Sequence, residues 1–466
     1  MAIVFSDIRV WDTGERIDLV VPDGRDVTVD ASRLTVAPGL EDPHVHFRDP
    51  GQTHKETMVT GCAAAAAGGY TNVLIMPNTV PAMDGQIVTP GEPGADEVLA
   101  AGCDNVIDYL QHYERIHDVT LPVRYELCVC ATKGRAGKEP TEPKDWAWYM
   151  PGHDDEKDAA QIAHPVTAMS DDGSAVPTPV LRDVLANVKE TGLYLIEHCE
   201  HHDVGAVNKG PIAKKLGVPG IPEETELAVV QRDIDMVRET GVHVHFQHVS
   251  TAISFDAIRR AKAEGLPITC ETAPHYLALS DEALLEYGTR AKMNPPLRSE
   301  KDRQATIAAI ADGTVDMIAT DHAPHTADEK ALGFLEAPNG IIGLECAFAV
   351  CHTVLVDGGW IGDERLIELM ALNPASLMGR HSTDIAGLLN TSAKCATKRT
   401  LDLGATEHPE RHDLVILGLD DAWTIHADEF RSKARNTPFD GWEVTGRPYA
   451  TIIGSRMASS RLDALA

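Results

Sequence analysis

Two histidines and an arginine recur at every second position near the start of the chain, within residues 39–51. In an extended strand successive side chains point to opposite faces, so His44, His46 and Arg48 are expected to share one face. Neutral imidazoles bind zinc well, and a guanidinium can hold a carboxylate through two parallel hydrogen bonds. Taken alone, the stretch fits an exposed His-x-His on an edge strand about as well as it fits a metal site.

Apolar strand-like runs alternate with helix-like segments along the middle of the chain, and these elements would position such a site. A run at 34–38 leads into the first strand. Further strands are expected at 70–76, 124–130, 166–169, 193–196, 242–246, 267–272 and 315–319, with helices at 56–67, 178–191, 223–240, 251–264 and 300–312. Eight strand–helix repeats predict an α/β fold, a (β/α)8 TIM barrel over residues 39–384. A doubly wound sheet is the alternative, but it would carry a glycine-rich turn where His-Val-His stands.

Both ends of the chain, residues 1–38 and 385–466, consist of short strand-like runs separated by turn residues. The N-terminal piece is too small to fold alone. We therefore expect the two ends to pair into one small β-sandwich module beside the barrel. An acidic stretch at 151–158 is expected to be a surface insertion.

Polar residues follow the predicted strands at the end where barrel enzymes carry their active sites. They are His44, His46 and Arg48 after the first strand, Asn78 after the second, Asp171 and Asp172 after the fourth, His198 after the fifth, His248 after the sixth, and Asp321 and His325 after the eighth. A single buried histidine is more often a hydrogen-bonded core residue than a metal ligand. Four histidines and two aspartates at equivalent barrel positions favour a pair of metal ions, because zinc accepts nitrogen and oxygen ligands.

The composition narrows the functions that the chain can have. With 41 lysine and arginine residues against 71 aspartate and glutamate residues, the formal net charge is −30. This balance argues against binding to nucleic acid or to anionic membranes. No run approaches the ~20 apolar residues that cross a bilayer, and the N-terminus lacks the features of a signal peptide, so we expect a cytoplasmic protein. The acidic excess suggests adaptation to a salty cytosol, with stability that rises with salt.

Seven motifs together resemble the cyclic amidohydrolases, and among them the class I dihydroorotases. They are DPHVHFRDPG at 42–51, MPNT at 76–79, SDDG at 170–173, EHCE at 197–200, QHVST at 247–251, KMNPPLR at 292–298 and ATDHAPH at 319–325. The resemblance extends from about residue 36 to 455. It implies a zinc-dependent enzyme of de novo pyrimidine biosynthesis, which reversibly closes N-carbamoyl-L-aspartate to L-dihydroorotate with loss of water.

The resemblance also implies a centre of two zinc ions. One ion would be bound by His44, His46 and Asp321, and the other by His198 and His248. Many relatives bridge the two ions with a carboxylated lysine after the fourth strand.

No lysine occurs between residues 157 and 189 in this chain, so the resemblance to the class I pattern assigns the bridge to Asp171 together with a hydroxide. Its neighbour Asp172 is set aside. Lys133, after the third strand, is the rival for the bridge, but its position suits a loop contact better.

The same resemblance implies how the substrate would be held and cleaved. The substrate carboxylate would be held by Arg48, Asn78 and His325, and the ring amide groups by Asn294, Asn339 and Gly340. Asn339 departs from the aromatic or small residue that is commoner there. Asp321 would act as a general base and then as a general acid, because it can take a proton from the hydroxide and pass it to the leaving nitrogen.

Two other readings of the sequence remain. An allantoinase or a hydantoinase/dihydropyrimidinase is the nearest alternative, although these enzymes usually carry the strand-four lysine. A barrel that has lost its metals and serves as a non-catalytic scaffold is the other, although such proteins typically lose histidine ligands. The expected partner is a small-molecule substrate, and the sequence leaves the oligomeric state open, a homo-oligomer included.

Overall fold

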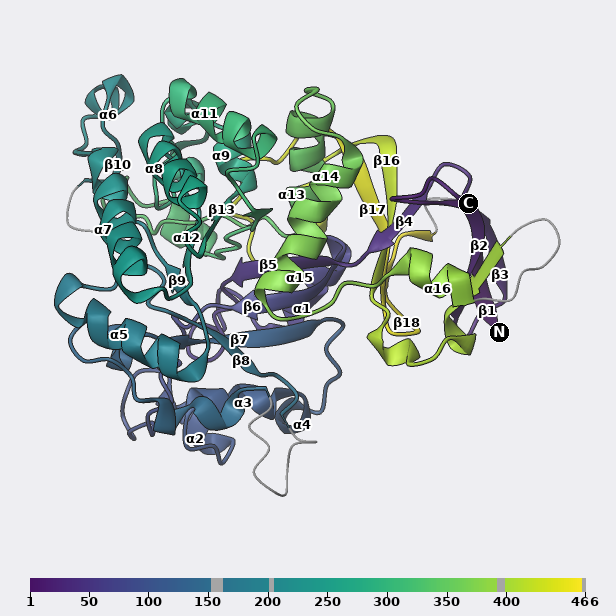
Figure 1. Cartoon of the computed structure of the whole chain (residues 1–466), viewed down its shortest axis with the longest axis horizontal. Helices are drawn as coiled ribbons and strands as arrows, with labels where there is room; N and C mark the ends of the chain where they lie inside the picture. The colour runs from purple at the N-terminus through teal and green to yellow at the C-terminus, as the bar shows by residue number, and fades with distance from the viewer. Residues whose placement is uncertain (152–161, 201–204, 392–398, 463–466) are drawn as a thin grey trace.

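A computed structural model describes residues 1–151, 162–200, 205–391 and 399–462. Two eight-stranded sheets organise it. In Figure 1 the barrel and its helices occupy the left and the centre, while the second sheet lies at the right together with both termini. Apart from Pro151, the predicted acidic insertion lies outside the described residues.

One sheet forms a nearly closed ring of parallel strands. Its strands, in spatial order, are β5 (Leu40–Val45), β6 (Tyr70–Ile75), β7 (Arg124–Cys130), β8 (Val166–Ser170), β9 (Leu195–Glu197), β12 (Val244–Phe246), β13 (Ile268–Thr272) and β14 (Met317–Ile318). The chain after β14 returns to β5, where Val45 and His322 form a parallel bridge. The prediction of a (β/α)8 barrel is confirmed.

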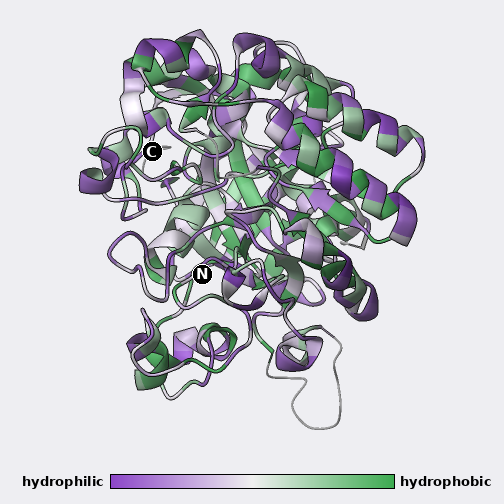
Figure 2. Cartoon of the chain, turned by 90° about the vertical axis from the view of Figure 1, so that its left-hand side faces the viewer, coloured by the Kyte–Doolittle hydropathy of each residue, from purple (hydrophilic) through white to green (hydrophobic). Residues whose placement is uncertain are grey.

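The long helices between these strands follow the predicted segments. They are α1 (Met58–Ala67), α5 (Thr178–Thr191), α7 (Glu224–Thr240), α8 (Ala252–Ala263) and α11 (Glu300–Ala311). A capping box at Thr57 begins α1, and left-handed glycines, Gly192 and Gly241, end α5 and α7. Figure 2 shows hydrophobic residues gathered on the central strands, with helices of mixed character around them.

Short helices and strands lie in the connections between the barrel strands and after the barrel, and the sequence did not predict them. Between β6 and β7 lie α2 (Ala95–Ala100), α3 (Val106–Gln111) and α4 (Tyr113–His117). Later connections contain β10 (Val207–Asn208), α6 (Pro211–Leu216), β11 (Gly220–Ile221), α9 (Pro274–Ala278), α10 (Leu284–Tyr287) and α12 (Ala327–Lys330). After the barrel come α13 (Ala347–Cys351), α14 (Asp363–Ile367), α15 (Asn373–Leu377) and α16 (Ile385–Thr391). None of the helices in the described part of the chain combines the length and the apolarity needed to cross a bilayer.

The second sheet joins the two chain ends, as predicted. It contains β1 (Ala2–Val10), β2 (Arg16–Pro22), β3 (Val27–Asp30) and β4 (Thr35–Pro38) from the N-terminal side, and β15 (Arg399–Asp402), β16 (Leu414–Thr424), β17 (Glu443–Ile453) and β18 (Arg456–Ser460) from the C-terminal side. The two sides meet where β4 pairs antiparallel with β16. The exact domain limits stay a prediction.

The run at 34–38 belongs to this second sheet rather than to the barrel. The chain passes from β4 to β5 at Gly39, where a Cβ atom would lie 2.3 Å from the Thr71 side chain. A glycine therefore allows one strand to end and the next to begin without a loop.

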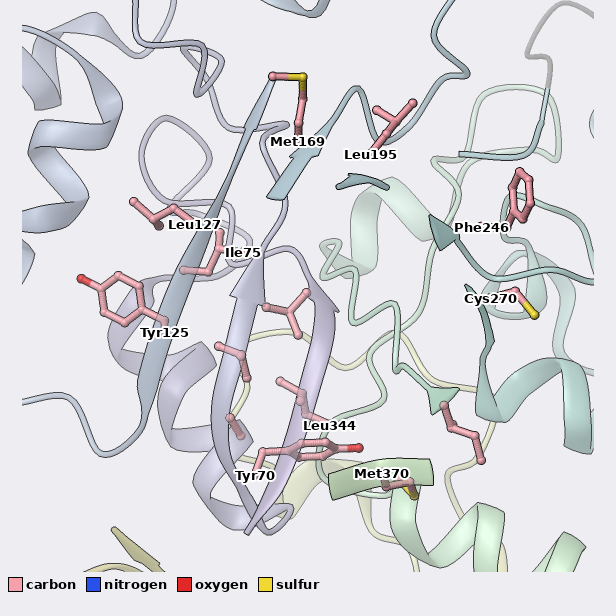
Figure 3. Close-up of a cluster of buried hydrophobic side chains, with 14 of the residues drawn as sticks. Tyr70, Ile75, Tyr125, Leu127, Met169, Leu195, Phe246, Cys270, Leu344 and Met370 are labelled. Atoms are coloured by element: carbon pink, nitrogen blue, oxygen red, sulfur yellow. The ribbon is translucent and has the colours of Figure 1, made fainter. Parts of the chain in front are cut away.

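A continuous apolar cluster surrounds the barrel and fixes its strands. Figure 3 shows part of this cluster, with Tyr125 and Leu127 on β7, Met169 on β8, and Leu344 and Met370 from the segment after β14. Each of these side chains is buried, and burial of one such side chain contributes ~1.5–3 kcal/mol. The strand ends are thus held rigidly, as a site of defined geometry requires.

Candidate metal centre and active site

The histidines predicted at the strand ends meet at the mouth of the barrel. The ligand atoms of His44, His46 and Asp172 lie within 4.8 Å of one another, and so do those of Asp172, His198 and His248. All of these residues are buried. Because Asp172 belongs to both groups, the arrangement is that of two adjacent cation sites that share one carboxylate.

The structure corrects the expected position of Asp171. Asp172 Oδ1 lies 3.4 Å from His44 Nε2 and 3.4 Å from His198 Nδ1. Asp171 faces the other way, where its carboxylate accepts hydrogen bonds from the Thr132 N–H, at 3.0 Å, and from the Thr132 hydroxyl. Strand β8 ends at Ser170, so the alternation of side chains could not decide which aspartate points at the histidines. Lys133, the other candidate, pairs with Glu142 at 2.9 Å.

A carboxylate that the sequence reading missed orients His44. Glu271 on β13 lies 2.8 Å from His44 Nδ1, and its other oxygen lies 3.1 Å from His245 Nε2. Burial by itself raises the pKa of Glu271, but the hydrogen bonds with His245 and His44 outweigh it and lower the pKa to about 2. An ionised carboxylate on Nδ1 leaves Nε2 of His44 for a ligand. The sequence feature that could have indicated Glu271 is its position as a charged residue within an otherwise buried strand.

His46 is fixed by Asn78 and Asp321. Asn78 Oδ1 lies 2.8 Å from His46 Nδ1, and Asp321 Oδ1 lies 3.1 Å from His46 Nε2. Burial lowers the pKa of His46. For Asp321, burial raises the pKa, but the contacts with His46, His44 and His248 outweigh it, so the pKa is lowered and the group is ionised. The neutral imidazole and the ionised carboxylate are the forms that bind a cation.

The donor set fits a divalent metal such as zinc. Burial lowers the pKa of His44, but the carboxylates of Asp172, Glu271 and Asp321 outweigh it and raise that pKa well above its usual value. The centre therefore attracts positive charge. His248 Nδ1 is buried and has no hydrogen-bond partner among the described residues. Nitrogen and oxygen donors that converge in a buried site are what zinc takes.

Three residues at the centre have left-handed backbones although none is glycine. They are Arg48, with φ of 60°, His248, with φ of 32°, and Asp321, with φ of 49°. Each such residue costs of order 1 kcal/mol, and such residues concentrate at functional sites. Strand β5 ends at Val45, so Arg48 reaches the site from this turn and not from an extended strand.

A cavity of about 140 Å³ opens above the histidines. Its walls contain all but one of the residues predicted to hold a substrate, namely Arg48, Asn78, Asn294, Asn339 and Gly340. The exception is His325, whose Nε2 donates to the Asn339 carbonyl at 2.7 Å. Burial, together with Arg48, Lys55 and Lys330, lowers the pKa of His325 to about 2, so its ring is neutral. His325 therefore contacts the backbone of the cavity wall and does not line the cavity itself.

Comparison with known proteins agrees with this geometry. A family model described as "Amidohydrolase family" matches residues 35–383. This chain belongs to the amidohydrolase family. It is 38% identical to a dihydroorotase of Geobacter metallireducens over 93% of this chain and 90% of that protein, and 37% identical to a dihydroorotase of Lactiplantibacillus plantarum over 98% of each. The family that the motifs predicted is confirmed.

The fold of this amidohydrolase also occurs in solved structures of a hydantoinase and a dihydropyrimidinase. L-hydantoinase (dihydropyrimidinase) from Arthrobacter aurescens superimposes with a TM-score of 0.73 at 23% identity, covering 98% of this chain and 96% of that chain. Dihydropyrimidinase from Brevibacillus agri superimposes with a TM-score of 0.71 at 18% identity, covering 99% and 95%. At these identities the likeness shows the shared fold. The amidohydrolase family is metal-dependent, and the histidine and aspartate groups described above are able to bind metal.

Proposed function

We propose that the protein is a dihydroorotase, which interconverts L-dihydroorotate and N-carbamoyl-L-aspartate in pyrimidine biosynthesis. The observation that carries this proposal is Arg48 in the cavity wall beside the metal-binding residues. Dihydroorotate has a free carboxylate that hydantoin, dihydrouracil and allantoin lack, and a guanidinium is the group that holds it best. Burial lowers the pKa of Arg48 to about 10, so the guanidinium is charged at neutral pH. The curated relatives with the dihydroorotase name support the same substrate.

The proposed cofactor is a pair of zinc ions. His44, His46 and Asp321 would hold one ion, His198 and His248 the other, and Asp172 would bridge them. When bound, such ions lower the pKa of a coordinated water towards neutrality and polarise an amide carbonyl.

The chain's own residues would then guide the reaction. Arg48 and Asn78 would hold the substrate carboxylate, and Asn294 would orient the ring. The ionised Asp321 is poised to accept a proton from the attacking water and to pass it to the departing ring nitrogen, as a general base and then a general acid. In the opposite direction the same groups would support ring closure.

The proposed location is the cytoplasm. The eight cysteines in the described residues are buried and form no disulfide, which suits a reducing compartment.

Parallel assays with dihydroorotate, hydantoin, dihydrouracil and allantoin test the function. We expect dihydroorotate to be turned over in preference to the other three. Removal of metal with a chelator should abolish turnover, and about two zinc ions per chain should restore it. Faster turnover of hydantoin or dihydrouracil would reject the proposal in favour of a hydantoinase, and a metal-free protein without any turnover would favour the scaffold.

A further inference from the structure

The cavity wall around Asn339 is held from outside by buried side chains. The carbonyl groups of four consecutive residues, 337–340, each accept a hydrogen bond from a side chain. The donors are Lys292 Nζ to Ala337, Lys330 Nζ to Pro338 and Gly340, His325 Nε2 to Asn339, and Asn436 Nδ2 to Gly340. With every carbonyl occupied, the orientation of each peptide group in this segment is fixed.

Lys330 is the central donor of this set. Its side chain is buried, and its Nζ donates to the carbonyls of Pro338 and Gly340, both at 3.0 Å, and of Lys292, at 3.2 Å. These three bonds use all three protons of an ammonium group. Lys330 has no ion pair with a carboxylate in the part of the chain that the structure describes. A buried lysine without a counter-ion is costly, so its position calls for an explanation beyond packing.

The bond to Pro338 determines where the next N–H points. In a trans peptide the C=O and the following N–H point in opposite directions, so a Pro338 carbonyl directed at Lys330 turns the Asn339 N–H away from Lys330. Asn339 lines the cavity, and its N–H makes no hydrogen bond to any described residue.

The neighbouring N–H of Gly340 is not available to a ligand, because it donates to the Lys292 carbonyl at 3.0 Å. Gly340 is needed for space instead: its φ is 122°, and a Cβ would lie 2.6 Å from the Ala323 Cβ. Of the two backbone N–H groups, those of Asn339 and Gly340, only the Asn339 N–H is therefore available to a ligand.

We propose that Lys330 is a positioning residue for substrate recognition. It holds the Asn339 N–H towards the cavity, where that N–H donates to the ring carbonyl that does not react. This inference rests on the proposed function, since the ring of dihydroorotate carries a second carbonyl that can accept this bond. A contact to a group that does not react is equally strong in the ground state and the transition state, so its loss raises KM and leaves kcat unchanged.

The test compares the zinc-loaded enzyme with Lys330→Met, which keeps an unbranched side chain as far as Cε and removes the Nζ donors. The matched control is Lys301→Met, at an exposed lysine on α11. We expect Lys330→Met to raise KM for dihydroorotate about tenfold with kcat within about twofold of wild type, and the control to change neither. Zinc content should equal that of wild type. Lys330→Gln keeps an N–H donor, so its KM should lie between that of wild type and that of Lys330→Met.

The outcomes separate this inference from the proposed function. If the wild-type holoenzyme does not turn over dihydroorotate, the proposed function fails and this inference falls with it. If wild type is active and Lys330→Met shows an unchanged KM, or a lower kcat at an unchanged KM, the inference alone is overturned. Should Lys330→Met not fold, Lys330→Gln against Lys301→Gln decides by the same criterion, and failure of both to fold would show that the lysine is structural and overturn the inference.

Discussion

Asp171 and Asp172 are neighbours whose carboxylates have different partners, so single substitutions separate their roles. We expect Asp172→Ala to lower zinc content and to reduce turnover by more than about 100-fold, because both groups of histidines lose their shared carboxylate. Asp171→Ala should keep its zinc and lose ~1–2 kcal/mol of stability, because only Thr132 loses its acceptor. Elemental analysis and thermal melts of both variants measure this. Metal loss in Asp171→Ala with retention in Asp172→Ala would reverse the assignment.

At this scale the sequence located the centre but not every residue in it. The spacing of His44, His46 and Arg48 indicated one site, but strand geometry accounts for His44 alone, because β5 ends at Val45 and Arg48 reaches the site from a left-handed turn. Beyond a strand end no such rule applies, so the choice between Asp171 and Asp172 needed coordinates. The role of Lys330 could not be predicted, because its partners are backbone carbonyl groups, which every residue has.

Among the barrel strands, β5 carries a buried acid whose titration affects stability. Burial raises the pKa of Glu41 to about 7, although Arg380 lies 3.3 Å away and Asn72 donates to the same carboxylate. The unfolded chain has the ordinary value of ~4.3. The folded state therefore binds the proton more tightly, and this contribution to stability is present at low pH and is lost as the pH rises through about 7.

We expect a change from pH 8 to pH 6 to raise the free energy of unfolding by about 1 kcal/mol through Glu41. Glu41→Gln should remove that part of the pH dependence. Urea unfolding of wild type and variant at both pH values measures it, with the exposed Glu239→Gln as the control. An identical pH dependence in Glu41→Gln and wild type would contradict the expectation.

Long helices and strands with clear end signals were predicted better than short ones. Helices α5 and α7 were located closely because each has an apolar face and ends at a glycine, Gly192 or Gly241. The short helices α2, α3 and α4 were missed, since segments of five or six residues show too little periodicity. Strand β4 lies within residues 1–38, which were expected to join the small β-module, but an apolar run does not reveal that its partner there is β16.

For the whole molecule, the alternation of strands and helices was enough to predict the barrel. The individual closing contact was not predictable, because it joins residues as distant in the sequence as Val45 and His322. The pairing of the two chain ends was predictable for a simpler reason, since neither end could bury its apolar residues alone. The net charge of the molecule, in contrast, is set by its composition whatever the fold.

An excess of 30 acidic charges repels itself across the whole surface. The Debye length falls from ~10 Å at 0.1 M salt to ~3 Å at 1 M, so salt removes most of this repulsion. Salt also weakens exposed ion pairs such as Arg182–Glu239, but each of these contributes at most ~1 kcal/mol. Because unpaired acids outnumber such pairs, we expect the melting temperature to rise by several degrees between 0.1 and 2 M KCl at pH 7.5.

The control for this expectation is the same salt series near the isoelectric point. Salt also strengthens burial of apolar surface, and that effect does not depend on net charge. At a pH close to the sequence pI of about 5.0 the net charge is small, so the part of the salt effect that comes from repulsion should disappear. A melting temperature that falls with KCl at pH 7.5, or that rises equally at both pH values, would show that the acidic surface does not limit the stability of this barrel.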